Sequence, residues 1–221
     1  MTTLTIISSI IDIPNTPLSY CNTRSVFTRE ERFEQTKQTI RSIKTKIPNT
    51  RILLVECSPF TTEEQTFFEE NCDFVVNLIN NEYAKNAIWS ISKSWGEGTM
   101  TIEAFRFIKE NNIEYNRLIK ISGRYWLDDN FLYDKTNMQS NIAYIHENPL
   151  NVCTALYILS KEHSELWNQF LNNSRDYFLN CKNYEEIFAL FMKTLPETSY
   201  TVLSKIGVSG YIAPFGNIME M

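Results

Sequence analysis

The chain has 221 residues, enough to bury one sizeable core, and its 43% hydrophobic and 21% charged residues exclude a disordered polymer. The net charge of −5 argues against a nucleic-acid partner, because general nucleic-acid binders carry a basic surface. No run approaches the about 20 apolar residues of a membrane span, so no span is expected either.

The cysteines number five, an odd count, and none of them forms a CxxC pair. Such usage is typical of reduced thiols rather than of a disulfide framework. We therefore expect a cytoplasmic protein.

Over the first half of the chain, buried-strand patterns alternate with helical patterns. The predicted elements are a strand at Thr3–Ile10, a helix from the capping box Thr28-Arg-Glu-Glu31 to Pro48, a strand at Arg51–Glu56, a helix at Thr62–Asn71, a strand at Asp73–Leu78, a helix at Thr99–Asn111 and a strand at Leu118–Ser122. Such alternation predicts parallel β-α-β units.

The second half is more mixed. It predicts strands at Ile142–Ile145 and Val152–Leu159, a helix capped by Ser160, and a last helix at about Tyr184–Thr194. With no linker or repeat in the sequence, we expect one α/β, Rossmann-like domain over residues 1–221. Its sheet is expected to be mixed, mostly parallel and flanked by helices.

Polar residues follow the predicted strands, and the carboxyl ends of parallel strands usually open into a ligand crevice. Ser9 ends the first strand and Glu56 the second; a carboxylate there accepts hydrogen bonds either from a ribose or base, or from a helix N-terminus or surface cation. Lys93 lies in a polar loop before a helix and is a candidate for binding a diphosphate. In the alternative interpretation Lys93 is an ordinary solvent-exposed lysine that binds no ligand.

The turn Ser122-Gly-Arg124 is the sharpest local signal. Gly123 allows a close backbone approach to a ligand, and Arg124 offers a fork of donors for phosphate or carboxylate. Arg124 could instead pair with Asp128 or Asp129. Those two acids are also candidate ligands of a divalent cation, although adjacent residues of an extended strand point to opposite faces, so at most one would reach a given ion.

Other familiar sites are absent from the sequence. It contains no GxGxxG, no GxxxxGK[ST], no HExxH and no GxSxG pattern. The nucleotide-type crevice is what remains.

The order of these residues resembles the nucleotide-sugar glycosyltransferases of the GT-A fold. More narrowly, four segments resemble glycosyltransferase domains of chlorella viruses that build capsid glycans: Arg24-Ser-Val-Phe-Thr-Arg-Glu-Glu-Arg-Phe-Glu34, Leu54-Val-Glu-Cys-Ser58, Ser92-Lys-Ser-Trp-Gly-Glu97 and Lys120-Ile-Ser-Gly-Arg-Tyr125. The resemblance covers most of the chain and is clearest over residues 1–130.

This resemblance implies a UDP-sugar donor, a Mn²⁺ or Mg²⁺ ion on its diphosphate, a glycan or glycoprotein acceptor, and transfer of a hexosyl group. It implies a nucleotide-binding part at about 1–130 and an acceptor-side part at about 131–221. Carried over by position, Ser9, Glu56 and Arg24 would lie near the uridine, and Lys93 with the turn Ser122-Gly123-Arg124 near the diphosphate and donor sugar.

The sequence departs from the family at one place, because Ser122-Gly-Arg124 stands where most such enzymes have Asp-x-Asp. Either other acids hold the metal, Asp128 or Asp129 being nearest in sequence, or Arg124 partly replaces it. An inverting reaction also needs a carboxylate base, for which Glu185 or Glu186 is the candidate and Glu147 the reserve. A non-catalytic sugar-nucleotide or glycan-binding domain and a sugar-phosphate nucleotidylyltransferase stay open as alternatives.

Overall fold

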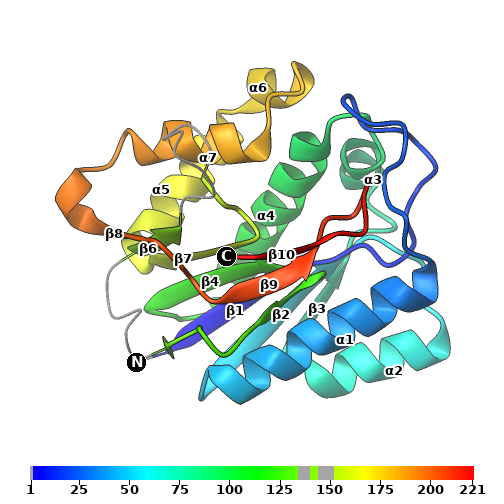
Figure 1. Cartoon of the computed structure of the whole chain (residues 1–221), viewed down its shortest axis with the longest axis horizontal. Coiled ribbons are helices and arrows are strands. Elements are labelled where there is room, and N and C mark those ends of the chain that lie inside the picture. Colours follow the sequence, from blue (N-terminus) through cyan, green and yellow to red (C-terminus); the bar gives the residue numbers. More distant parts are fainter. Residues whose placement is uncertain (1, 134–139, 144–151) are drawn as a thin grey trace.

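Figure 1 shows the computed structural model of the chain, which describes residues 2–133, 140–143 and 152–221. Within these residues the main sheet has seven strands in the order β3-β2-β1-β4-β7-β6-β8. They are β1 (Thr3–Ser8), β2 (Thr50–Glu56), β3 (Phe74–Asn77), β4 (Arg117–Ser122), β6 (Ser140–Ala143), β7 (Leu156–Ser160) and β8 (Tyr200–Leu203). Strands β3, β2, β1 and β4 are parallel, and β7 joins β4 antiparallel, so the sheet is mixed and mostly parallel as predicted.

The helices pack on both sides of this sheet. They are α1 (Arg29–Lys46), α2 (Thr62–Asn71), α3 (Glu82–Ile88), α4 (Lys93–Glu110), α5 (Lys161–Asn172), α6 (Arg175–Leu179) and α7 (Tyr184–Met192), with a short 3-10 helix at Glu197–Ser199. Figure 1 shows α1 and α2 on one side of the sheet and α4, α5 and α7 on the other. Among the described residues, no helix has the length and apolar character needed to cross a membrane.

The alternation of side chains along each strand builds two hydrophobic cores, one on each face. Leu53 and Val55 of β2 belong to the core under α4 and α7, whereas Ile52 and Leu54 belong to the core under α1 and α2. The sequence therefore reads as a continuous apolar run in the strands, as expected for a sheet covered on both faces.

The chain reverses its direction of travel across the sheet after β3. Strands β1, β2 and β3 are added outward, and the chain then returns through α3 and α4 to place β4 on the other side of β1. The register pairs Ser8 with Ser122, so the carboxyl ends of β1 and β4 lie side by side at this switch point. Open α/β sheets bind ligands at such a point.

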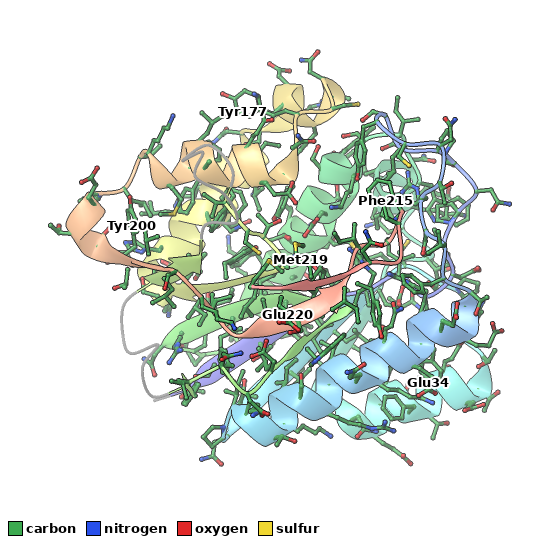
Figure 2. The ribbon with its side chains drawn as sticks, in the orientation of Figure 1. Glu34, Tyr177, Tyr200, Phe215, Met219 and Glu220 are labelled. Atoms are coloured by element: carbon green, nitrogen blue, oxygen red, sulfur yellow. The ribbon has the colours of Figure 1, made fainter. Side chains whose placement is uncertain are left out.

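A second, smaller sheet covers part of the α1 side. It contains β5 (Tyr125–Leu127), β9 (Val208–Tyr211) and β10 (Ile218–Glu220) in the order β10-β9-β5. Figure 2 shows Met219 and Glu220 on β10 and Phe215 in the loop between β9 and β10. Since β9 pairs with β5, the end of the chain returns to the segment that follows β4.

Most predicted elements are confirmed, including the capping box of α1 at Thr28 and the cap of α5 at Ser160. The predicted strand at Ile142–Ile145 overlaps β6, and Ile145 lies outside the described residues. The elements that the sequence analysis missed are short: α3, α6, β5, β8, β9 and β10.

The predicted start of α4 at Thr99 is wrong, because the helix begins at Lys93 after the N-cap Ser92. Gly96 and Gly98 suggested a loop, yet both serve packing. A Cβ at Gly96 would lie 2.9 Å from the Cα of Ile88, and one at Gly98 would lie 2.4 Å from the ring of Phe178. The glycines let α4 approach α3 and α6 closely.

Gly96→Ala tests this assignment. In an open helix the change would stabilise the protein by up to about 1 kcal/mol. Here we expect a loss of about 1–3 kcal/mol in the free energy of unfolding, because the new methyl group overlaps the α3 backbone. Urea unfolding measures the effect, with Lys109→Ala on the exposed face of α4 as the control. A gain in stability for Gly96→Ala would contradict the packing role.

Candidate functional site

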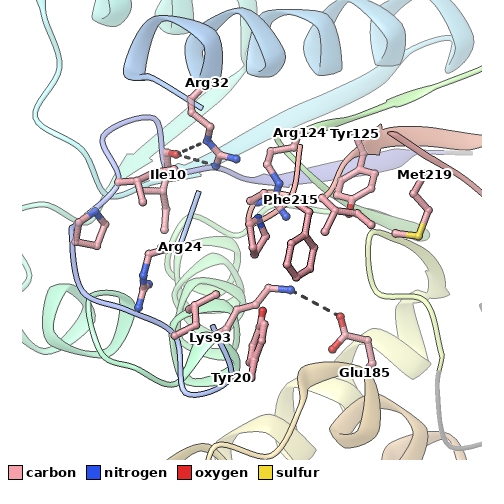
Figure 3. A pocket seen from close by; sticks show the side chains of 16 residues that line it. Ile10, Tyr20, Arg24, Arg32, Lys93, Arg124, Tyr125, Glu185, Phe215 and Met219 are labelled. Carbon is pink, nitrogen blue, oxygen red and sulfur yellow. Dashed lines mark hydrogen bonds and ion pairs between the residues drawn. The ribbon is translucent and has the colours of Figure 1, made fainter. Parts of the chain in front are cut away.

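A cavity of about 300 Å³ opens beside the carboxyl ends of β1 and β4 (Figure 3). A smaller one of about 90 Å³ lies deeper, between Ser9, Ser122 and Gly96. Four cationic side chains line both: Arg24, Arg32, Lys93 and Arg124. The main cavity also has an apolar wall, formed by Ile10, Ile13, Pro14, Leu18, Ile212, Ala213, Pro214, Phe215 and Met219.

All three arginines are held by backbone carbonyls. Arg24 donates from Nε to the oxygen of Thr16 at 2.9 Å and from Nη1 to that of Ile88 at 2.8 Å, and its Nη2 donates to Ser90. Arg24 therefore fastens the loop after β1 to the end of α3. Its contribution to the cavity is mainly its charge.

Arg32 comes from the second turn of α1 and is 4% exposed. Its Nε and Nη2 donate to the carbonyl oxygen of Ile10 at 3.1 and 2.8 Å. Its Nη1 is buried and has no hydrogen-bond partner among the described residues. Burial, and then the charge of Arg124, lower the pKa of Arg32 well below its usual range. An anion in the cavity would satisfy this group and offset the repulsion.

Arg124 and Lys93 reach into the cavity from opposite walls. Arg124 follows β4 and donates from Nε to the oxygen of Tyr211 at 3.2 Å, while its two Nη atoms have no hydrogen bond among the described residues. Lys93 is the first residue of α4, and its Nζ lies 3.9 Å from Oε1 of Glu185. Glu185 raises the pKa of Lys93, with burial acting in the opposite sense. Figure 3 shows the Lys93 ammonium directed toward Glu185, with Arg124 on the other side of the cavity.

A buried ion pair lies beneath the cavity. Lys120 is fully buried in β4 and contacts the carboxylate of Glu97 on α4. Its ammonium also donates to Oγ of Ser122 at 3.0 Å and to the oxygen of Thr154 at 3.2 Å. Burial opposes the ionisation of Glu97, but the charges of Lys120 and Lys93 outweigh it and hold the pKa of Glu97 below its ordinary value.

Glu185 stands between two cavities. It lines the main one and also a second, polar cavity of about 310 Å³ that contains Ser19, Ser94, Lys182 and Asn183. Tyr20, Lys93 and Glu185 are common to both. Oε1 of Glu185 also accepts a hydrogen bond from Thr154 at 3.3 Å. A carboxylate in this position can accept a proton from a group in the second cavity.

The structure therefore brings together six residues from the sequence analysis, namely Ser9, Arg24, Lys93, Ser122, Arg124 and Glu185. Gly123 is adjacent to them, but its role differs from the expected one. A Cβ there would lie 2.7 Å from that of Ser9, so the glycine allows β4 to approach β1 rather than a ligand.

Glu56 lies behind the site. It is fully buried; Oε2 accepts from the backbone nitrogen of Ile11 at 3.0 Å, and Oε1 accepts from that of Cys57 at 2.7 Å and from Oγ of Ser58 at 2.8 Å. Both carboxylate oxygens thus bind the chain itself. Glu56 does not line any cavity identified among the described residues, so it positions the loop after β1 instead of accepting from a ribose.

Asp128 and Asp129 lie at the far end of β5. Asp128 accepts from Ser209 Oγ at 2.7 Å and from the backbone nitrogen of Asn130 at 2.7 Å. Asp129 pairs with Lys46 at 2.7 Å, in the last turn of α1. Since the helix rises 1.5 Å per residue, Lys46 is about 20 Å from Arg32 along its axis. The two acids therefore do not reach the cationic cavity.

The residues around the cavity do not fit a divalent cation. Such an ion takes several oxygen ligands, usually carboxylates. The lining carboxylates of the described residues are Glu97 and Glu185, and each faces a lysine ammonium. No group of three or more metal-ligating side chains occurs in the described ranges 2–133, 140–143 and 152–221.

Glu186 lines neither cavity, and it pairs at 3.1 Å with Lys182 in the wall of the second one. The reserve candidate, Glu147, lies outside the described residues. The sequence analysis missed Arg32, Glu97 and Lys120. A lysine in the middle of the apolar strand Leu118-Ile-Lys-Ile was the available signal, because a buried lysine is rare unless paired. Arg32 gave no such signal, because it is the last of four consecutive charged residues, Arg29-Glu-Glu-Arg32, at the start of the predicted helix.

Comparison with known protein families and with curated sequences finds no match. Solved structures do match in fold. A glycosyltransferase involved in the glycosylation of the major capsid of PBCV-1 has a TM-score of 0.50 and 12% identity, over 91% of this chain and 81% of that one. Core-mannan synthase A from Aspergillus fumigatus, in a Mn/GDP form, has a TM-score of 0.55 and 9% identity, over 91% and 72%.

A third match is the CTP:phosphocholine cytidylyltransferase from Streptococcus pneumoniae, with a TM-score of 0.52 and 13% identity over 95% of this chain and 93% of that one. The chain thus has the GT-A-like fold shared by nucleotide-sugar transferases and nucleotidylyltransferases. At these identities the likeness concerns the fold alone.

The buried carboxyl of Glu56 predicts a pH-dependent stability. Burial raises its pKa from 4.5 to about 7, against the hydrogen bonds that favour the anion. Between these values the folded chain keeps a proton that the unfolded chain releases, so this contribution to the free energy of unfolding falls as the pH rises from about 4.5 to 7. The full effect is on the order of 3 kcal/mol.

Glu56→Gln should remove this slope. It should cost about 1–3 kcal/mol near pH 4.5, where Glu56 is protonated, because its amide group would face a backbone N–H, and this cost should shrink as the pH rises to 7. Urea unfolding from pH 4.5 to 8 measures both effects, and Glu70→Gln on the exposed face of α2 is the control. Equal slopes in the wild type and Glu56→Gln would contradict the assignment.

Proposed function

We propose that the chain is a glycosyltransferase that moves a hexosyl group from a nucleoside-diphosphate sugar, with a UDP-sugar as the first candidate, to a hydroxyl of a glycan. The observation that carries the proposal is the position of Glu185, at the boundary between a cationic cavity and a polar cavity. A donor and an acceptor could occupy the two at once, with a carboxylate between them.

The main cavity suits the nucleotide part of a donor. Its cations complement a diphosphate, and its apolar wall offers a surface for the base and ribose. The wall comes partly from the loop after β1 and partly from Ile212–Phe215, and these segments are linked by a hydrogen bond from Val26 N to Ala213 O of 2.9 Å. From the sequence we expected residues 1–130 or so to bind the nucleotide and the rest to face the acceptor. We now propose that Ile212–Phe215, near the end of the chain, also contributes to the donor site.

The second cavity suits a hydroxyl-rich acceptor, because serine, asparagine and lysine side chains line it. In the proposed reaction the acceptor oxygen attacks the anomeric carbon and its proton passes to Glu185. The bond from that carbon to the diphosphate oxygen breaks, and the oxygen keeps the electron pair. The cations of the main cavity stabilise the charge that develops on it. Attack opposite the leaving group inverts the anomeric carbon.

The finer parts of the proposal rest on the resemblance in sequence. A capsid glycan is the acceptor to test first, since one matched structure is described as acting in capsid glycosylation. Five unpaired cysteines favour a reducing compartment such as the cytoplasm. Against a nucleotidylyltransferase, the first loop (residues 12–22) lacks the glycines that usually surround a nucleoside triphosphate in such enzymes.

The roles of Glu185 and its neighbour can be separated by a matched pair of variants. Glu185→Gln should lower the rate of transfer by about 100-fold or more, because the base is lost, with the affinity for nucleotide little changed. Glu186→Gln changes an adjacent residue that lines neither cavity. Because Glu186 contacts Lys182 and Asn183 of the second cavity, we expect this variant to lose far less activity than Glu185→Gln, with any effect confined to the KM for the acceptor. Transfer from radiolabelled UDP-glucose to a capsid glycan measures the rate.

Equal activity of Glu185→Gln and wild type would remove Glu185 from the reaction. Nucleotide binding without turnover on any acceptor would instead support the non-catalytic alternative.

A further inference from the structure

We infer that this chain neutralises the donor diphosphate with its own side chains, Arg32, Lys93 and Arg124, and binds the nucleotide without a divalent cation. The inference rests on the proposed function and specifies the chemistry of the same site.

The part of the chain that the structure describes supplies the donors that an anion needs. Arg32 lines both the main and the deeper cavity, and its buried Nη1 has no hydrogen-bond partner among these residues. Arg124 presents two Nη atoms, and it is held in place through its Nε. Lys93 Nζ is 3.9 Å from Glu185, too far for a hydrogen bond, and its side chain is 40% exposed. Three separate elements, α1, α4 and the end of β4, therefore direct positive groups at one space.

Of the acids near the site that the structure describes, Glu97 and Glu56 are already engaged by the chain itself. Lys120 contacts Glu97, and the ammonium of this fully buried lysine cannot leave without breaking its bonds to Ser122 and Thr154. Both carboxylate oxygens of Glu56 accept hydrogen bonds from backbone N–H groups, and one of them also accepts from Ser58. Among the described residues this leaves Glu185 alone as a lining carboxylate outside a close ion pair, with Lys93 Nζ 3.9 Å away, and one carboxylate does not supply the several oxygen ligands that a divalent ion takes.

The net charge of the residues that line the cavities also favours an anion over a divalent cation. Four cations and two acids line the main and deeper cavities together, and one of these acids is paired with Lys120. A dication would add to this excess, whereas a diphosphate would offset it.

Calorimetric titration of the whole chain with UDP tests the inference, once in EDTA and once in excess Mn²⁺, with GDP and CMP as further probes. We expect UDP to bind in EDTA with a dissociation constant within about threefold of that in Mn²⁺. Binding that requires Mn²⁺, or that tightens tenfold or more with it, would overturn the inference and leave the proposed function standing. Failure of all three nucleotides in both conditions would overturn the proposed function as well.

Two variants assign the binding to these side chains. In EDTA, Arg124→Ala should weaken UDP binding at least tenfold, and Arg124→Lys, which keeps the charge but loses the fork, should fall between it and wild type. Arg41→Ala, on the exposed face of α1, is the control and should bind as wild type does. Unchanged affinity in Arg124→Ala, with its unfolding midpoint preserved, would overturn the assignment.

Discussion

The ion pair between Lys120 and Glu97 is the interaction on which the rest of the site depends. It joins the middle of β4 to the first turns of α4, with Lys120 fully buried and Glu97 largely buried, and the same ammonium holds Ser122 and Thr154. Breaking a buried pair of this kind costs about 3–5 kcal/mol, because one charge is left without a partner. Lys93 begins α4 and Arg124 follows β4. The ion pair beneath the cavity therefore fixes the distance between these two cations.

The cavity itself follows from topology. Because the chain returns across β1 to form β4, two carboxyl strand ends meet at Ser8 and Ser122 with no crossover helix between them. Gly123 allows the close contact with Ser9, and Glu56 holds the loop that leaves β1 by accepting from Ile11. The residues that shape this edge are thus bound to one another, which leaves the cations to face the open space.

Much of this arrangement could be predicted from the sequence, and the failures have physical causes. The long strands could be predicted because a strand buried on both faces needs a continuous apolar run. The long helices could be predicted because a hydroxyl side chain caps the first turn, as Thr28 and Ser160 do. Strand β5 pairs with β9, about 80 residues further along the chain, and such a long-range pairing leaves no local pattern. Strands β9 and β10 pair with each other locally, but with four and three residues they are too short to show an alternation. Glu56 was misplaced because a strand-end acid looks the same whether it faces a ligand or the backbone. Asp128 and Asp129 are near Arg124 in sequence, yet β5 carries them to the other end of α1.

A nucleoside diphosphate is proposed to bind between Arg32, Lys93 and Arg124. A crystal structure of the chain grown with UDP in EDTA would show its position. We expect the diphosphate within hydrogen-bond distance of Arg32 Nη1 and the Arg124 guanidinium, with the uridine against the wall that contains Phe215. Diphosphate bound elsewhere, or held only through a metal ion when Mn²⁺ is supplied, would contradict it.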